Sequence, residues 1–68
     1  MNKYYISYCI HLLRVTKFYY IIINFNKQLT EKNLEEIKYE IVKECYEKFE
    51  ITTNIDNVII LGIVKLDE

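Results

Sequence analysis

Few residues in this chain have types that could do chemistry. The candidates for nucleophilic catalysis are two cysteines, Cys9 and Cys45, and a single histidine, His11. Cys9 and His11 lie two residues apart, so in a strand they share one face, with Cα atoms about 6 to 7 Å apart. Nucleophilic catalysis also needs an orienting group and an oxyanion hole, and no motif for either accompanies this pair. We therefore predict no catalytic residue and no enzymatic activity.

Metal and cofactor chemistry is not indicated either. The cysteines, the histidine and the glutamates show no ligand spacing, which predicts no metal site. Gly62 is the only glycine and the chain has no proline, so it lacks a glycine-rich phosphate loop. We predict no cofactor, and we interpret both cysteines as buried free thiols, since free cysteine packs as a small hydrophobic residue.

Length and composition limit the organisation of the chain. Its 68 residues allow one small domain, covering residues 1–68. A hydrophobic content of 51% with 28% charged residues predicts a folded chain and not a disordered one. The longest apolar run, Phe18 to Ile23, is far shorter than the roughly 20 residues that span a membrane. We expect a cytoplasmic protein without membrane contact.

Hydrophobic periodicity places three strands and one helix. Apolar residues alternate from Tyr4 to Leu13 and again from Asn57 to Leu66, and a β-branched and aromatic run covers Phe18 to Phe25. The polar segment Arg14 to Lys17 predicts a hairpin between the first two strands.

The helix is predicted from about Glu31 to Phe49. Thr30 has the type and position of an N-cap, and Leu29 and Leu34 have the spacing of a hydrophobic staple. Leu34, Ile37, Ile41 and further apolar residues then recur at steps of three and four, as on one side of a helix.

The order strand, strand, helix, strand predicts an α+β domain with the helix packed on one face of a three-stranded sheet. The helical crossover makes the second and third strands parallel to each other, with the first antiparallel to both. We favour the spatial order 2-1-3, with 1-2-3 as the alternative.

One helix covers one face of such a sheet, so the other face needs a partner. The apolar residues expected on that face are Tyr5, Leu13, Phe18, Tyr20, Ile22, Ile59 and Leu61, together with Cys9 and Ile63. A contiguous apolar patch marks a protein interface, and we predict a homodimer formed by stacked sheet faces or by paired edge strands. The alternative is a slip of one residue in a strand, which would exchange buried and exposed sets.

Charge is divided unevenly along the chain. Residues 1–27 hold four basic residues and no acidic one, whereas residues 31–50 hold seven glutamates and four lysines. The acidic residues expected on the solvent side of the helix are Glu35, Glu36, Glu40, Glu44 and Glu47. Such carboxylates could bind a basic groove of a partner, or they could simply be a solvated helix side. Alternatively, Lys3, Arg14 and Lys17 among the tyrosines could form a small nucleic-acid-binding surface.

The opening segment Lys3-Tyr4-Tyr5-Ile6-Ser7-Tyr8 and the closing segment Asn57-Val58-Ile59-Ile60-Leu61, with Lys65-Leu66, resemble short proteins encoded by phages and mobile elements of low-GC bacteria. This resemblance carries over no functional residue. It implies a class of proteins that bind and block one host protein, as anti-CRISPR and other anti-defence proteins do. The expected function is therefore a non-enzymatic inhibitor of a host defence protein, nucleoprotein or nuclease.

Overall fold

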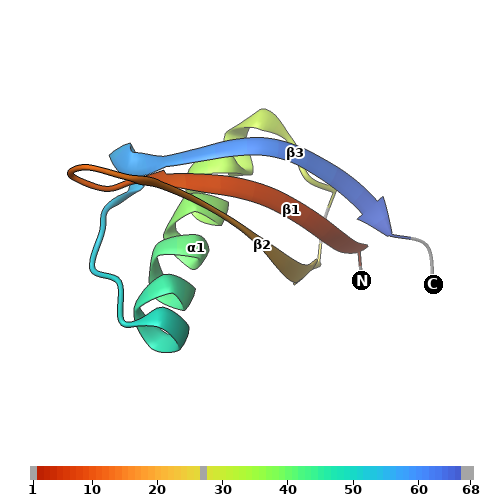
Figure 1. Ribbon diagram of the computed structural model, residues 1–68. Helices are drawn as coiled ribbons and strands as arrows, with labels where there is room; N and C mark the ends of the chain where they lie inside the picture. Colours follow the sequence, from red (N-terminus) through yellow and green to blue (C-terminus); the bar gives the residue numbers. More distant parts are fainter. Residues whose placement is uncertain (1, 27, 67–68) are drawn as a thin grey trace.

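The computed structural model describes residues 2–26 and 28–66. Its elements, in chain order, are β1 (Asn2–His11), β2 (Thr16–Phe25), the 3₁₀ turn η1 (Glu31–Asn33), α1 (Leu34–Phe49), the 3₁₀ turn η2 (Ile55–Asn57) and β3 (Val58–Leu66). The predicted α+β architecture is confirmed, and α1 lies on one side of the three curved strands (Figure 1).

The sheet has the order β2-β1-β3, as favoured from the connection rules. β1 is central and pairs antiparallel with both neighbours. Because β2 and β3 run in the same direction without touching, the helical crossover joins two edge strands across the central one.

The hairpin between β1 and β2 is displaced from its predicted position. Its loop lies before Thr16, and the backbone N–H of Leu12 donates to the carbonyl of Val15 at 2.8 Å. The prediction of a loop from Arg14 to Lys17 was wrong because Thr16 and Lys17 are polar yet pair with His11 and Ile10 in the strand ladder. Sequence polarity alone does not mark the end of an edge strand that is partly solvated.

The core lies between the sheet and α1. The buried residues of the helix are Ile37, Ile41 and Cys45, and those of the sheet on that side are Tyr4, Ile6, Tyr8, Ile10, Ile21 and Val58. The alternation predicted for β1 is confirmed by this set, because its even-numbered residues from Tyr4 to Ile10 are the ones that pack under the helix.

Both ends of the helical segment are fixed by local bonds. Thr30 is the N-cap residue, as predicted, and its backbone N–H and its hydroxyl both donate to Oδ1 of the buried Asn33, at 3.1 and 2.9 Å. At the other end Glu50 adopts a left-handed conformation with φ 57°, and its N–H donates to the carbonyl of Tyr46 at 3.1 Å.

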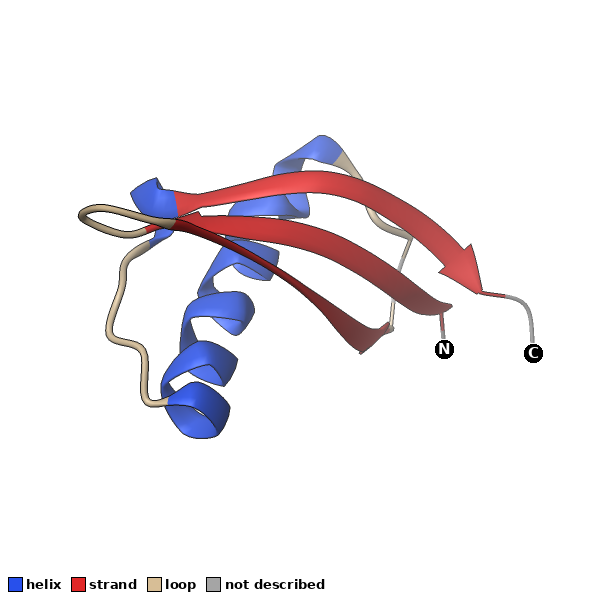
Figure 2. Cartoon of the chain, in the orientation of Figure 1, coloured by secondary structure: helices blue, strands red, loops and turns tan. Residues whose placement is uncertain are grey.

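α1 crosses the sheet from one edge strand to the other. Its first turns lie beside β3, where Leu34 and Glu35 line a hollow with Val58. Its last turn lies against β2, where the rings of Phe49 and Tyr19 stack with centroids 4.6 Å apart. Within the described residues no helix or strand lies on the opposite face of the sheet (Figure 2).

Candidate functional site

The uncovered side of the sheet is rich in apolar side chains, and we call it the open face. The strand register defines it as nine residues in three rows across the sheet: Phe18, Cys9 and Ile59; Tyr20, Ser7 and Gly62; Ile22, Tyr5 and Val64. Six of the residues predicted for this face are in the set: Tyr5, Cys9, Phe18, Tyr20, Ile22 and Ile59.

Three predicted members of this face have other positions. Leu13 is 98% exposed and lies in the hairpin loop, beyond the end of β1. Ile63 pairs with the buried Ile6, so it points to the helix side. Leu61 is the extra residue of a β-bulge, since Ser7 pairs with Gly62 while Tyr8 pairs with Ile60. The bulge shifts the alternation by one residue and places Val64, which was not predicted there, on the open face.

Two polar side-chain contacts lie on and beside the open face. Ser7 Oγ donates to the carbonyl of Gly62 at 3.4 Å, across the middle row. At the hairpin end of the face, His11 Nδ1 and Thr16 Oγ1 lie 3.0 Å apart. At the other end, Lys3 pairs with Asn24 and Leu66 and so lies beyond the third row. The face therefore has an apolar centre between two polar ends.

Cys9 and His11, the pair with the best spacing for chemistry, share the open face as their spacing predicts. The Cys9 side chain is buried with 4% exposure, whereas His11 is exposed and its Nδ1 is bonded to Thr16. A buried thiol is not accessible to a substrate, so the geometry does not assemble a nucleophilic site from these two residues.

The second cysteine is part of the core. Cys45 Sγ lies 3.5 Å from the hydroxyl of Tyr8, and neither side chain is exposed. Burial raises the pKa of the Tyr8 hydroxyl far above its ordinary range, and the bond to Cys45 adds to this rise. Burial likewise raises the pKa of the Cys45 thiol, although the bond to Tyr8 opposes the shift. Both cysteines are free and buried, as predicted.

The five predicted acidic residues do not form a single surface. Glu40, Glu44 and Glu47 line hollows against β2, whereas Glu35 lines a hollow on the other side of the helix, against η2 and the start of β3. A helix has 3.6 residues per turn, so the direction of Glu35 around the helix axis differs by more than a quarter turn from that of each of the other four. Glu36 is exposed.

The three glutamates beside β2 border the outer edge of the sheet. Glu40, Glu44 and Glu47 line one hollow with Ile21, Ile22, Ile23 and Lys43. Adjoining hollows share some of these residues and extend to Phe18 and Phe49 at one end and to Asn24 and Phe25 at the other. We call this continuous depression between β2 and the second half of α1 the edge groove.

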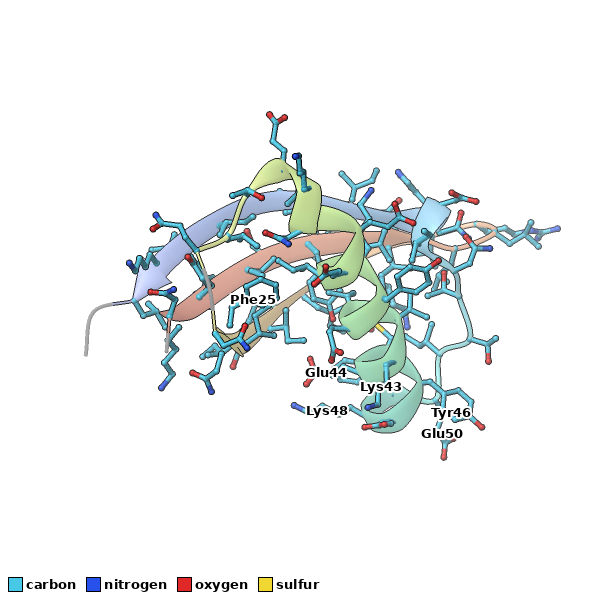
Figure 3. All side chains as sticks on the ribbon, turned by 180° about the vertical axis from the view of Figure 1, so that it is seen from behind. Phe25, Lys43, Glu44, Tyr46, Lys48 and Glu50 are labelled. Atoms are coloured by element: carbon cyan, nitrogen blue, oxygen red, sulfur yellow. The ribbon has the colours of Figure 1, made fainter. Side chains whose placement is uncertain are left out.

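Charges in the edge groove are mixed, with the three glutamates beside Lys43 and Lys48. Glu44 forms an ion pair with Lys48, with Oε1 and Nζ 3.0 Å apart. Figure 3 shows Glu44 and Lys48 extending from the same side of α1, while Tyr46 points the opposite way. The groove was missed from the sequence, although the favoured strand order already makes β2 an edge strand. Its existence depends on the angle at which α1 crosses the sheet.

The predicted basic surface is not assembled. Lys3 is at the far end of the open face, and Arg14 is exposed in the hairpin loop at the other end of β1. Lys17 pairs with the buried Ile10, so it points to the helix side of the sheet. Lys27, the fourth basic residue of this segment, lies outside the described residues. The geometry therefore does not favour a nucleic-acid-binding surface made of these residues.

The described parts of the chain contain neither a cluster of metal ligands nor a candidate membrane span. Residues 2–26 and 28–66 contain no group of three His, Cys, Asp or Glu side chains placed to hold a metal ion. No helix in these ranges is long and apolar enough to cross a membrane. No protein-family model, curated protein or solved structure matches the chain.

Proposed function

We propose that the protein acts without catalysis, by binding and blocking another protein in the cytoplasm of a bacterial host. The proposed target is a defence protein, nucleoprotein or nuclease, the class that the sequence resemblance implies. The observation that carries the proposal is the juxtaposition of the outer edge of β2 with the carboxylates of α1 in the edge groove.

The outer edge of β2 supports contact with an extended segment of a partner. In the described residues β2 has one neighbouring strand, β1, and it is ten residues long without a bulge or a proline. Such an edge presents backbone N–H and C=O groups to which another strand can bond. An added strand would lie beside the groove, so its side chains on the helix side would meet Glu40, Glu44 and Glu47.

The charge of the groove supports a basic partner. Glu40 and Glu47 are exposed, and Glu44 is partly buried beside them. Proteins that handle nucleic acids carry Lys and Arg clusters for phosphate contacts, and carboxylates at a groove can occupy such clusters in place of phosphate. Blocking a nucleic-acid-binding site by contact needs no catalytic residue.

The test is a plasmid-interference panel. Bacterial strains that each carry one defence nuclease are transformed with a targeted plasmid, with and without expression of this protein. We expect transformation to be restored in at least one strain, and binding to the purified nuclease to weaken as salt is raised. A well-expressed protein that restores transformation in no strain would contradict the proposed function.

Two charge-reversed variants locate the binding surface. Replacing Glu40 and Glu47 by Lys should lower affinity for the nuclease at least about tenfold, which corresponds to about 1.4 kcal/mol. The matched control replaces Glu31 and Glu35 by Lys. These are exposed glutamates on the β3 side of the same helical segment, so this variant should bind as the wild type does. Equal loss in both variants would show that net charge, and not the edge groove, governs binding.

A further inference from the structure

We propose that the open face is the contact surface between two copies of this chain, which pack sheet against sheet as a homodimer. This inference goes beyond the proposed function, because it concerns the side of the sheet that faces away from α1 and its carboxylates. It also selects between the two modes of dimerisation that the sequence left open.

The first argument is area. The apolar side chains of the open face remain substantially exposed: Tyr5 37%, Phe18 68%, Tyr20 59%, Ile22 47%, Ile59 40% and Val64 56%. Taking about 200 Å² for a fully exposed large side chain, these fractions amount to about 600 Å² per copy. A single monomer rarely exposes a larger apolar patch, and about 1,200 Å² for two copies reaches the range of specific interfaces.

The second argument is composition. None of the nine residues of the open face is charged. Its one serine, Ser7, donates from Oγ to the carbonyl of Gly62. An apolar centre between polar ends is the usual anatomy of a stable interface. A charged partner surface would lose the hydration of its charges here without gaining an opposite charge, whereas a second open face has no charge to desolvate.

The third argument is the variation in side-chain size across the face. Tyr20 and Phe18 are large and mostly exposed, while Gly62 has no side chain and Ser7 has a short one. The side chains along β2 are therefore larger than those of the middle row on β1 and β3. A two-fold axis brings the same surface onto itself, so large and small side chains are present on both sides of the contact. Two sheets packed in this way stand about 10 Å apart, with interdigitated side chains.

The dimer leaves the carboxylates of the proposed partner site accessible. The edge groove and the open face share Phe18 and Ile22 on β2, but Glu40, Glu44 and Glu47 lie on α1, on the other side of the sheet. Two copies stacked through their open faces would carry their helices on the outside. The dimer would then present two edge grooves.

The test is sedimentation velocity of three purified proteins across a wide concentration series. The first variant is Tyr20→Lys, which places a charge in the middle row of the open face. The matched control is Tyr39→Lys, because Tyr39 has the same residue type and almost the same exposure, 58% against 59%, but lies on α1. We expect wild type and Tyr39→Lys to be dimers that tolerate high salt, since an apolar contact is not screened. We expect the dimer dissociation constant of Tyr20→Lys to rise at least about tenfold.

Two outcomes would overturn the inference. A wild type that is monomeric across the series would show that a second copy does not cover the face. A dimer that persists in Tyr20→Lys would place the contact elsewhere, such as the edge of β2. If Tyr20→Lys loses its helical circular dichroism, Val64→Lys takes its place, since Val64 is 56% exposed in the neighbouring row. Transformation assays are read separately, so failure of the dimer and failure of the inhibitor proposal are distinguishable.

Discussion

Tyr5 and Tyr20 stack on the open face, with ring centroids 5.1 Å apart and ring planes inclined by 17°. They are diagonal neighbours, because Tyr5 stands opposite Ile22 and Tyr20 stands opposite Ser7. The short side chain of Ser7 leaves room for the ring of Tyr20 to lean toward Tyr5. The stack therefore joins β1 to β2 on the side of the sheet that has no helix.

This stack should contribute to stability beyond the area that each ring buries. A double-mutant cycle of Tyr5→Ala and Tyr20→Ala should give a coupling free energy of about 0.5 to 1.5 kcal/mol. The measurement is urea unfolding at one fixed protein concentration. A parallel cycle of Tyr5→Ala with Tyr39→Ala should give no coupling, and equal coupling in both cycles would contradict a specific contribution from the stack.

The Tyr8 and Cys45 contact predicts a loss of stability at alkaline pH. Both groups are buried and neutral, with pKa values raised above the ordinary 10.0 of the phenol and 9.0 of the thiol. The unfolded chain releases these protons first, so it binds fewer protons than the folded chain above about pH 9. The stabilising effect is therefore complete below pH 9 and is lost as the pH rises. Each group lowers the unfolding free energy by about 1.4 kcal/mol per pH unit where only its unfolded form is ionised.

The measurement is the free energy of unfolding from pH 7 to 11. Tyr8→Phe removes one of the two ionising groups, so its stability should fall less steeply above pH 10 than that of the wild type. A wild type whose stability is flat over this range would show that Tyr8 and Cys45 ionise equally in both states.

The end of α1 offers a stabilising substitution. Glu50 has φ 57°, a left-handed conformation in which the Cβ atom of any residue but glycine is crowded. Glu50→Gly should therefore raise the free energy of unfolding by up to about 1 kcal/mol. Glu50→Ala is the matched control, because it removes the same charge but keeps Cβ, and its stability should not rise. If both variants gained stability equally, the charge of Glu50 and not its conformation would be the cause. Thermal unfolding, monitored by circular dichroism, distinguishes these two causes.

The sequence by itself determined the elements and their order, and it favoured the strand arrangement over one alternative. Alternation from Tyr4 onward predicts a strand, the spacing of Ile37, Ile41 and Cys45 predicts the buried side of the helix, and Thr30 predicts its start. These patterns arise from interactions within a few residues along the chain, which the local sequence specifies. A helical connection between two strands then leaves few topologies, and of the two orders left open the favoured one, β2-β1-β3, is confirmed.

Only the tertiary structure decided which residues share a surface. The bulge at Leu61 depends on how β3 pairs with β1, and it moved Ile63 to the helix side and Val64 to the open face. The crossing of α1 toward β2 separated Glu35 from Glu40 and Glu47 and formed the edge groove. Register and crossing angle are set by packing between segments distant in sequence, so local periodicity leaves them open. For the same reason the sequence predicted an apolar open face but not its exact membership.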